Sequence, residues 1–220
     1  MAVARPASVG LMLRHKKQRQ KRWVFDGWIA GLGTTSGTRI VVGRWRRSPF
    51  GSFGDVMIED VTGHRRLIAP RPEIAEFIAE TYTFDSVEIG HFGVTANRGE
   101  WAITVGPLHL AFELGRRAPL GYLLRVVPPP LARRPAWAAA IDRPARWLMP
   151  GVSTRGTAGN DRREWYGAQD LRPITAAVAW LDGVDLGGLE RVDPPVRFGF
   201  GSVPPAPALV RVTTTVERGI

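Results

Sequence analysis

The segment GVSTRGTAGNDRREWYG, residues 151–167, holds the densest set of side chains that could do chemistry. Its glycines at positions 156 and 159 permit positive φ, so successive amide N–H groups can form a nest for an anion. Arg155, Arg162 and Arg163 can add planar, fork-shaped donors that suit a carboxylate or a phosphate. The segment therefore predicts an anion-binding site, with a ligand set of Arg155, Asn160, Arg162, Arg163, Glu164, Tyr166 and, from elsewhere in the chain, His91.

The same segment has a second interpretation, in which it only connects two apolar regions. Asn160 then makes the turn, Glu164 pairs with neighbouring arginines, and Tyr166 anchors the loop to the core. The sequence leaves both interpretations open. A site is retained because a long polar stretch of irregular chain inside a domain is more often functional than idle.

No motif in the chain specifies a reaction, and no catalytic residue is assigned. Glu164, Asp170, Tyr166 and His91 are the candidates for acid–base work. His91 follows Val87 and Ile89 at period two, which favours a hydrogen-bonded core imidazole or a cavity-lining one. The serines lack the spacing of a nucleophile elbow, and the separations of the histidines do not indicate a metal site, so we expect neither metal nor cofactor.

Missing residue types exclude several classes of function. The chain has no cysteine, which removes disulfides, thiolate metal sites and cysteine nucleophiles and fits a cytoplasmic protein. Its three lysines, Lys16, Lys17 and Lys21, all precede the predicted domain, so no P-loop and no lysine Schiff base can form within that domain. The apolar runs are shorter than the roughly 20 residues of a membrane-spanning helix.

The net charge of +10 is concentrated at the N-terminus. Residues 1–22 hold seven basic side chains and no acidic one, and the remaining residues hold 23 basic and 20 acidic side chains. We expect a disordered basic tail over residues 1–22 and one nearly neutral β-rich domain over residues 23–220. A nucleic-acid partner is conceivable only through this tail. The oligomeric state cannot be inferred.

Hydrophobic periodicity predicts the scaffold. Period-two runs predict strands along most of residues 23–114 and 174–217, including PVRFGF at 195–200, with a hairpin at GLGTTSG. RPEIAEFIAETY, residues 71–82, predicts one amphipathic helix, and residues 133–149 a short helical crossover that leads into a polar loop over residues 151–172. The fold class is mainly β (β-rich α+β): a single antiparallel barrel or sandwich with that helix and crossover.

One stretch resembles a known family by the order of its elements. The hairpin containing SPFGSF, the strand RLIAP and the helix RPEIAEFIAETY lead back into strands over residues 48–115, and this order resembles the acetoacetate-decarboxylase-like β-barrel proteins. The resemblance implies a barrel with a small-molecule cavity. In that family a lysine forms a Schiff base with the substrate, and because no position of the domain supplies it, the decarboxylase activity is in doubt.

These observations lead to three hypotheses. The first is a barrel that binds a small, partly apolar, anionic ligand, between a face near His91 and tryptophans of the crossover. The second is a non-covalent isomerase, cyclase or lyase that acts in the same cavity. The third is an interaction protein that uses the basic N-terminal tail. Whether the protein is an enzyme stays undecided at this level.

Overall fold

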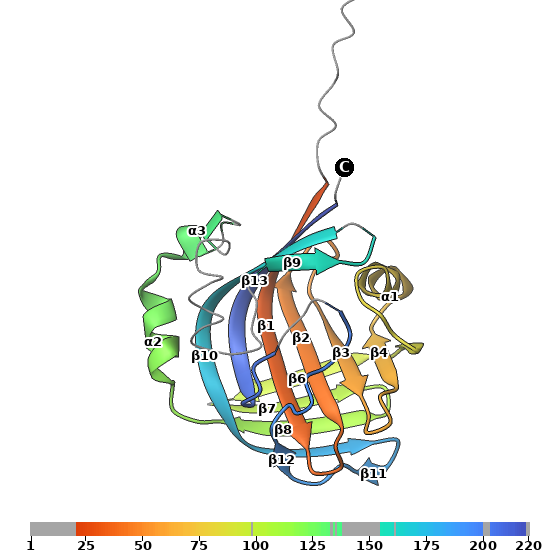
Figure 1. Ribbon diagram of the computed structural model, residues 1–220. Coiled ribbons are helices and arrows are strands. Elements are labelled where there is room, and N and C mark those ends of the chain that lie inside the picture. Colours follow the sequence, from red (N-terminus) through yellow and green to blue (C-terminus); the bar gives the residue numbers. More distant parts are fainter. Residues whose placement is uncertain are drawn as a thin grey trace, which may run out of the picture.

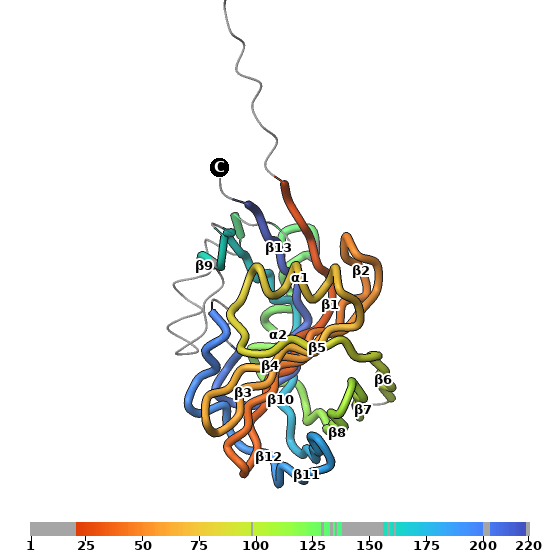
Figure 2. The backbone as a smooth tube through the Cα atoms, turned by 90° about the vertical axis from the view of Figure 1, so that its right-hand side faces the viewer, coloured from red at the N-terminus to blue at the C-terminus, as the bar shows by residue number. Residues whose placement is uncertain are grey.

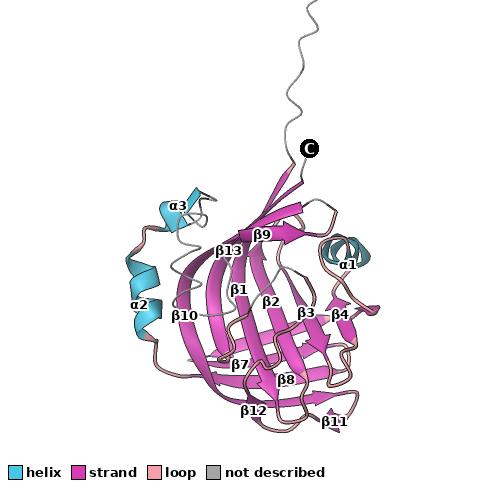
Figure 3. Ribbon diagram, viewed as in Figure 1, coloured by secondary structure: helices cyan, strands magenta, loops and turns pink. Residues whose placement is uncertain are grey.

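The computed structural model describes residues 21–97, 99–132, 134, 136–137, 155–160, 162–199 and 203–218 (Figure 1). Strands dominate, and the helices lie at the margins (Figure 3). The elements are β1 Arg22–Thr34, β2 Arg39–Arg47, β3 Phe53–Glu59, β4 Arg65–Ala69, α1 Pro72–Ala79, β5 Ser86–Ile89, β6 Phe92–Asn97, β7 Glu100–Val105, β8 Leu108–Leu114, α2 Pro119–Val126, α3 Pro129–Ala132, β9 Arg155–Ala158, β10 Arg162–Leu181, β11 Val184–Asp185, β12 Leu189–Glu190 and β13 Ala208–Arg218.

The described strands form one sheet with the order β5-β4-β3-β2-β1-β13-β10-β8-β7-β6, and β9, β11 and β12 pair at its margins. Neighbouring strands are antiparallel except for the parallel pair β4 and β5. The 20-residue strand β10 pairs with β13 along its first part and with β8 along its last part. Its register shifts near Ala168 and near Ile174 bend the strand, as bulges do, so that it joins two layers.

The sheet curls into a half-barrel whose layers are visible from the side (Figures 1 and 2). Strands β6–β8 cross one face of the β1–β4 layer, and α1 lies against the opposite side near the top. Because successive side chains of a strand point to opposite faces, β1 contributes to two cores. Ala30 and Leu32 pack against β6–β8, whereas Trp23 and Phe25 pack beside α1.

The helix α1 forms where the sequence predicts it and ends slightly earlier. Pro72 occupies the first turn, where its missing N–H costs nothing, and Ile74 and Ile78 are buried against the sheet. The amide of Glu80 still donates to the carbonyl of Glu76, and the Thr81 hydroxyl donates to the carbonyl of Phe77. This helix end places Glu80, Thr81 and Tyr82 over the first residues of β10.

The predicted fold class is confirmed: a mainly β chain with a curled antiparallel sheet and few helices. The hairpin β1–β2, predicted at GLGTTSG, and the hairpin β2–β3, which contains SPFGSF, also form. Two local predictions are wrong. The stretch PVRFGF is not a strand over its described residues 195–199. The polar loop predicted over residues 151–172 is instead the hairpin β9–β10 over its described part, because its polar side chains alternate between two faces of a sheet. Most of the crossover predicted over residues 133–149 lies outside the described residues; α2 and α3 precede it.

Candidate functional site

The candidate site lies on the face of the sheet that packs beside α1, here called the α1 face. It is defined by the side chains of Trp23, Phe25, Asp55, Glu164 and Tyr166. Strand register places four of these residues together, since Trp23 and Glu164 are each opposite Val216, and Phe25 and Tyr166 are each opposite Thr214. Opposite residues in an antiparallel pair share a face, so three central strands contribute to one surface.

Glu164 and two tyrosines form a compact cluster on this face. The hydroxyl of Tyr82 lies 3.0 Å from Oε1 and 2.9 Å from Oε2 of Glu164. The Tyr166 hydroxyl lies 3.1 Å from Oε2 and 2.9 Å from the Tyr82 oxygen. The two phenol protons can serve only two of these four oxygen–oxygen contacts. A proton on Glu164 serves a third, so the geometry suits a carboxyl that takes up a proton readily.

Burial sets the protonation of this cluster. Glu164 is only 1% exposed, and its burial raises its pKa to about 7, against the opposing effect of hydrogen bonds from Tyr82 and Tyr166 and of the charge of Arg162. Burial, followed by the negative charge of Glu164, raises the pKa of both tyrosines well above its ordinary value. Near neutral pH the cluster therefore holds a carboxyl that can either donate or accept a proton, beside two phenols that keep theirs.

A second buried carboxyl, Asp55 on β3, acts on the same cluster. It is 2% exposed and accepts a 2.9 Å hydrogen bond from the indole Nε1 of Trp45. Burial raises its pKa to about 6, and its charge adds to the raised pKa of Tyr166. Gly43 makes room for it, because a Cβ there would lie 2.5 Å from Asp55 Oδ1. The site thus combines two buried carboxyls with different acidities.

The buried hydroxyl of Thr214 on the α1 face makes no hydrogen bond. Thr214 is 4% exposed and stands opposite Phe25 and Tyr166, and its Oγ1 has no hydrogen-bond partner. A buried polar atom without a partner costs free energy unless something occupies the position. Thr214 is therefore an anchor available to a bound molecule.

Arg162 occupies the end of the α1 face but is committed to the scaffold. It is buried, and its guanidinium donates to the carbonyl of Phe77, to the hydroxyl of Thr81 and to the carboxylate of Glu80. It also lies over the rings of Trp23 and Phe77, at 5.4 and 4.5 Å from their centroids. These contacts tie β10 to the end of α1 and use both terminal nitrogens of the guanidinium, whereas its buried Nε has no hydrogen-bond partner.

Of the other residues predicted for the site, those with described side chains lie apart from this cluster. Arg155 is the first residue of β9, and its side chain lies outside the described part. Asn160 has a positive φ of 55° in the β9–β10 turn and donates to the carbonyl of Glu80 at 2.8 Å. Arg163 is exposed on the opposite face of β10. His91 is exposed after the edge strand β5, on whose outer side Val87 and Ile89 are exposed as well.

The structure thus brings Glu164 and Tyr166 together and places Arg162 and Arg163 on opposite faces of β10. Asp170, a further acid–base candidate, is bound through both oxygens by Arg117 at 2.7 and 2.9 Å. Sequence reasoning missed Asp55, Tyr82 and Thr214. Asp55 had a local signal, because it alternates with Phe53 and Met57 on a strand and so had to be buried. Tyr82 had none, since its contact with Glu164 spans 82 residues.

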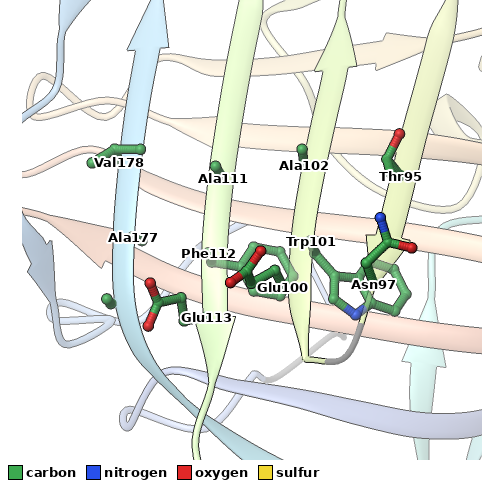
Figure 4. Close-up of a pocket in the computed structure, with 11 residues that line it drawn as sticks. Thr95, Asn97, Glu100, Trp101, Ala102, Ala111, Phe112, Glu113, Ala177 and Val178 are labelled. Carbon is green, nitrogen blue, oxygen red and sulfur yellow. The ribbon is translucent and has the colours of Figure 1, made fainter.

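A groove of about 400 Å³ lies on the other side of the molecule, on the outer face of β6–β8 and the end of β10 (Figure 4). Thr95, Ala102, Ala111 and Val178 form a row across it, each opposite its neighbour. Glu100 and Glu113 face each other along the next row, and both are exposed. Trp101, Phe112 and Asn97 also line the groove, and its two carboxylates are exposed to solvent, so it is a weaker candidate than the cluster.

The described part of the chain has neither a cluster of metal ligands nor a membrane-spanning helix. It contains no group of three or more histidines and carboxylates arranged to hold a metal ion. None of its helices combines the length and the apolar character needed to cross a membrane. The basic segment before Lys21 lies outside the described residues, so the nucleic-acid partner considered for it stays a prediction.

Comparison with known proteins shows similarity of fold alone. No protein-family model matches the chain, and no curated protein matches it at a significant level. Two acetoacetate decarboxylase structures resemble it. One, from Legionella pneumophila, has 9% identity and a TM-score of 0.41 over 90% of this chain and 85% of that chain. The other has 8% identity and a TM-score of 0.45 over 90% and 88%.

A third structure, described as an AttH protein from Nitrosomonas europaea, has 11% identity and a TM-score of 0.31 over 97% of this chain and 58% of its own. The weak resemblance to acetoacetate-decarboxylase-like proteins predicted from element order is thus confirmed as a resemblance of fold. At these scores it indicates neither an activity nor a ligand.

Proposed function

We propose that this protein binds a small, partly apolar molecule on the α1 face, with the polar end of that molecule at Glu164, Tyr82 and Tyr166. The observation that carries the proposal is the cluster itself, a buried carboxyl with a pKa of about 7 held by two phenol hydroxyls. Buried groups with strongly shifted pKa values gather at functional sites more often than elsewhere. The unpartnered hydroxyl of Thr214 adds a third anchor beside them.

The apolar part of the molecule would contact the half-buried side chains of this face. Ile29 and Val210 are opposite each other on β1 and β13, and both are partly exposed. Asp55, Gly43 and Ile29 lie in one cross-strand row, which links the second carboxyl to this apolar floor. A few polar groups on an apolar surface are the usual composition of small-molecule sites.

The contacts of the arginines lead us to revise the charge that the sequence suggested for the ligand. An anion would need free guanidinium groups, whereas Arg162 is bound to Glu80 and to the carbonyl of Phe77, and Arg163 points to the other face. We therefore favour a polar group that exchanges hydrogen bonds with carboxyl and phenol oxygens over the anionic group that the arginine-rich sequence suggested.

Native mass spectrometry of the full chain tests this proposal. The purified protein should carry a small-molecule adduct that is lost on denaturation, or should gain one from a compound mixture. Glu164→Gln and Tyr166→Phe should lose the adduct, and the matched control Glu113→Gln in the outer groove should keep it. An adduct that survives both α1-face variants but is lost in Ala111→Trp would place the ligand in the groove and overturn the proposal.

A second candidate function is proton-transfer catalysis at the same cluster. The pKa of about 7 favours it, because a general acid or base works best when its pKa lies near the working pH. The reaction class would be a non-covalent isomerisation, cyclisation or elimination, consistent with the lack of a lysine for covalent catalysis. Its test is exchange of a carbon-bound proton of the identified ligand with deuterated water, which should occur with the wild-type chain and stop in Glu164→Gln. Exchange at the same rate in that variant would exclude Glu164 as the acid or base.

A further inference from the structure

We propose that the molecule bound on the α1 face is a cationic amine, whose ammonium group sits beside Tyr166 under the influence of both Glu164 and Asp55. This inference rests on the proposed function, since it specifies the charge of the same ligand. It follows from the charges, the aromatic rings and the unused hydrogen-bond acceptor of that face, each of which is a separate observation.

The charges on this face do not balance within the described residues. Arg162 is the described cation whose charge acts on Glu164, and it forms an ion pair with Glu80. Neither Glu164 nor Asp55 forms an ion pair with any described arginine or lysine, and their hydrogen bonds come from the neutral donors Tyr82, Tyr166 and Trp45. Two ionised carboxylates would leave the face with a net negative charge that a bound cation can neutralise.

Elsewhere the same chain supplies cations to its buried carboxylates. Asp26 accepts hydrogen bonds from Arg211 and Arg47, and Glu59 forms ion pairs with Arg39 and Arg197. Arginine is abundant and could have filled the same role on the α1 face. The lack of a described cation beside Asp55 and Glu164 is therefore specific to this face, as expected where the cation arrives with a ligand.

Aromatic rings on the same face suit a cation. Trp23 and Phe77 pack edge to face at 5.3 Å, and Phe25 lies 5.4 Å from Phe77 and 5.6 Å from Trp45. Ring faces attract cations, and Arg162 already uses those of Trp23 and Phe77 in this way. The rings therefore form an environment in which a desolvated ammonium group is stabilised.

The third observation is the number of acceptors. An ammonium group of a primary amine has three N–H donors and no acceptor. The carboxylate of Glu164, the carboxylate of Asp55 and the unpartnered hydroxyl of Thr214 are all oxygens that can accept. Burial keeps both carboxyls partly protonated without a ligand, and a bound cation would lower both pKa values.

The test uses the full-length chain at pH 8 and two matched sets of probes: 2-phenylethylamine, 2-phenylethanol and phenylacetate, then hexylamine, hexan-1-ol and hexanoate. Calorimetric titration should show binding of the amines, and binding of the alcohols and carboxylates should be weaker by about tenfold or more. Glu164→Gln and Asp55→Asn should each weaken amine binding by a similar factor, and Glu113→Gln should not change it.

Circular dichroism confirms that each variant is folded. Thr214→Val serves as an independent variant should either acid variant fail to fold.

The outcomes separate the inference from the proposed function. Alcohols or carboxylates that bind as tightly as the amines, with that binding still lost in Glu164→Gln, would overturn the cationic ligand and leave the binding site in place. Amine binding that leaves the carboxyl ¹³C titration of Glu164 unchanged would place the ammonium group elsewhere and overturn the inference as well. Lack of binding by all six probes at millimolar concentration would contradict the inference, and with an adduct-free native mass it would contradict the proposed function too.

Discussion

Asp26 and Glu164 are buried carboxyls on opposite faces of one sheet, and their surroundings differ sharply. Arg211 donates to both oxygens of Asp26 at 2.8 Å, Arg47 donates at 3.1 Å and Thr213 at 3.0 Å. Burial alone would raise the pKa of Asp26, but these donors together hold it below its ordinary value. Among the described residues, Glu164 receives hydrogen bonds from the phenols of Tyr82 and Tyr166, and its burial raises its pKa to about 7.

The presence or absence of an arginine partner distinguishes a carboxylate that stabilises the fold from one that is available to a ligand. Breaking a buried ion pair is costly because it strands a charge, so a paired carboxylate fixes the strands that hold it. A buried carboxyl without a cation opposes folding whenever it is ionised. The α1 face keeps two such groups, which is understandable if a ligand compensates for them.

The largest expected effect concerns pH. The folded-state pKa values of Glu164 and Asp55, about 7 and about 6, lie above their ordinary values of 4.5 and 3.8. The folded state therefore binds more protons than the unfolded state between about pH 4 and 7, and its stability falls as pH rises through that window. Together the shifts correspond to a loss of roughly 6 kcal/mol. Urea unfolding at pH 4.5, 6 and 8 measures this change in the free energy of unfolding. In Glu164→Gln, the free energy should fall less between pH 6 and 8. A stability that rises steadily to pH 8 would contradict the raised values.

The next largest effect is the loss of a paired cation. Arg211→Ala leaves Asp26 with the exposed Arg47 as its remaining described guanidinium donor, and it should cost about 3 kcal/mol of unfolding free energy. Arg46→Ala is the matched control, because Arg46 is exposed and lies 5.9 Å from the Trp28 ring centroid without a described ion pair. Equal stability of the two variants in urea would show that the Asp26 network contributes nothing.

Removal of an unpaired carboxyl should have the opposite sign. Asp55→Asn keeps an oxygen to accept from Trp45 and removes the buried charge, so at pH 8 it should stabilise the protein by about 2 kcal/mol. The gain should vanish near pH 4, where Asp55 is largely protonated in the folded state. Destabilisation at pH 8 would indicate that a cation already compensates for Asp55.

The smallest effect is expected for Tyr82→Phe. It removes one hydrogen bond to Glu164 and should cost about 1 kcal/mol in thermal or urea unfolding. Since that hydrogen bond favours the charged form, the pKa of Glu164 should rise further, which carboxyl ¹³C chemical shifts can follow. A lower pKa in this variant would show that water or another donor replaces the phenol.

Periodicity predicted the elements in which apolar side chains alternate with polar ones. The helix α1 and the strands β2 and β3 belong to this group, because most of their buried residues are apolar or glycine. The first part of β10 was missed because its inward side chains are polar. Arg162 and Glu164 are buried and Arg163 is exposed, so the period-two pattern is present in burial but absent in hydrophobicity.

The site was predictable only in part for a related reason. Glu164 and Tyr166 share a short segment rich in functional groups, and composition singles them out. Tyr82 joins them through the end of α1, which leaves no local signature. The alternation of Asp55 with Phe53 and Met57 indicates that Asp55 is buried, but not that it lies near Tyr166. Arg162 was predicted as a ligand-binding residue, and in the structure its terminal nitrogens bind carbonyl, hydroxyl and carboxylate acceptors at the end of that helix.

The central claim is that the α1 face holds two buried carboxyls without an ion pair to any described cation, whereas Asp26 is paired with Arg211 and Arg47. A carboxyl ¹³C titration of the ligand-free protein, with Asp and Glu resonances assigned by substitution, tests this most directly. The account predicts midpoints near pH 7 for Glu164 and near pH 6 for Asp55, and one below the ordinary value for Asp26. Midpoints near 4 for both Glu164 and Asp55 would show that these carboxyls are solvated or paired, and would contradict it.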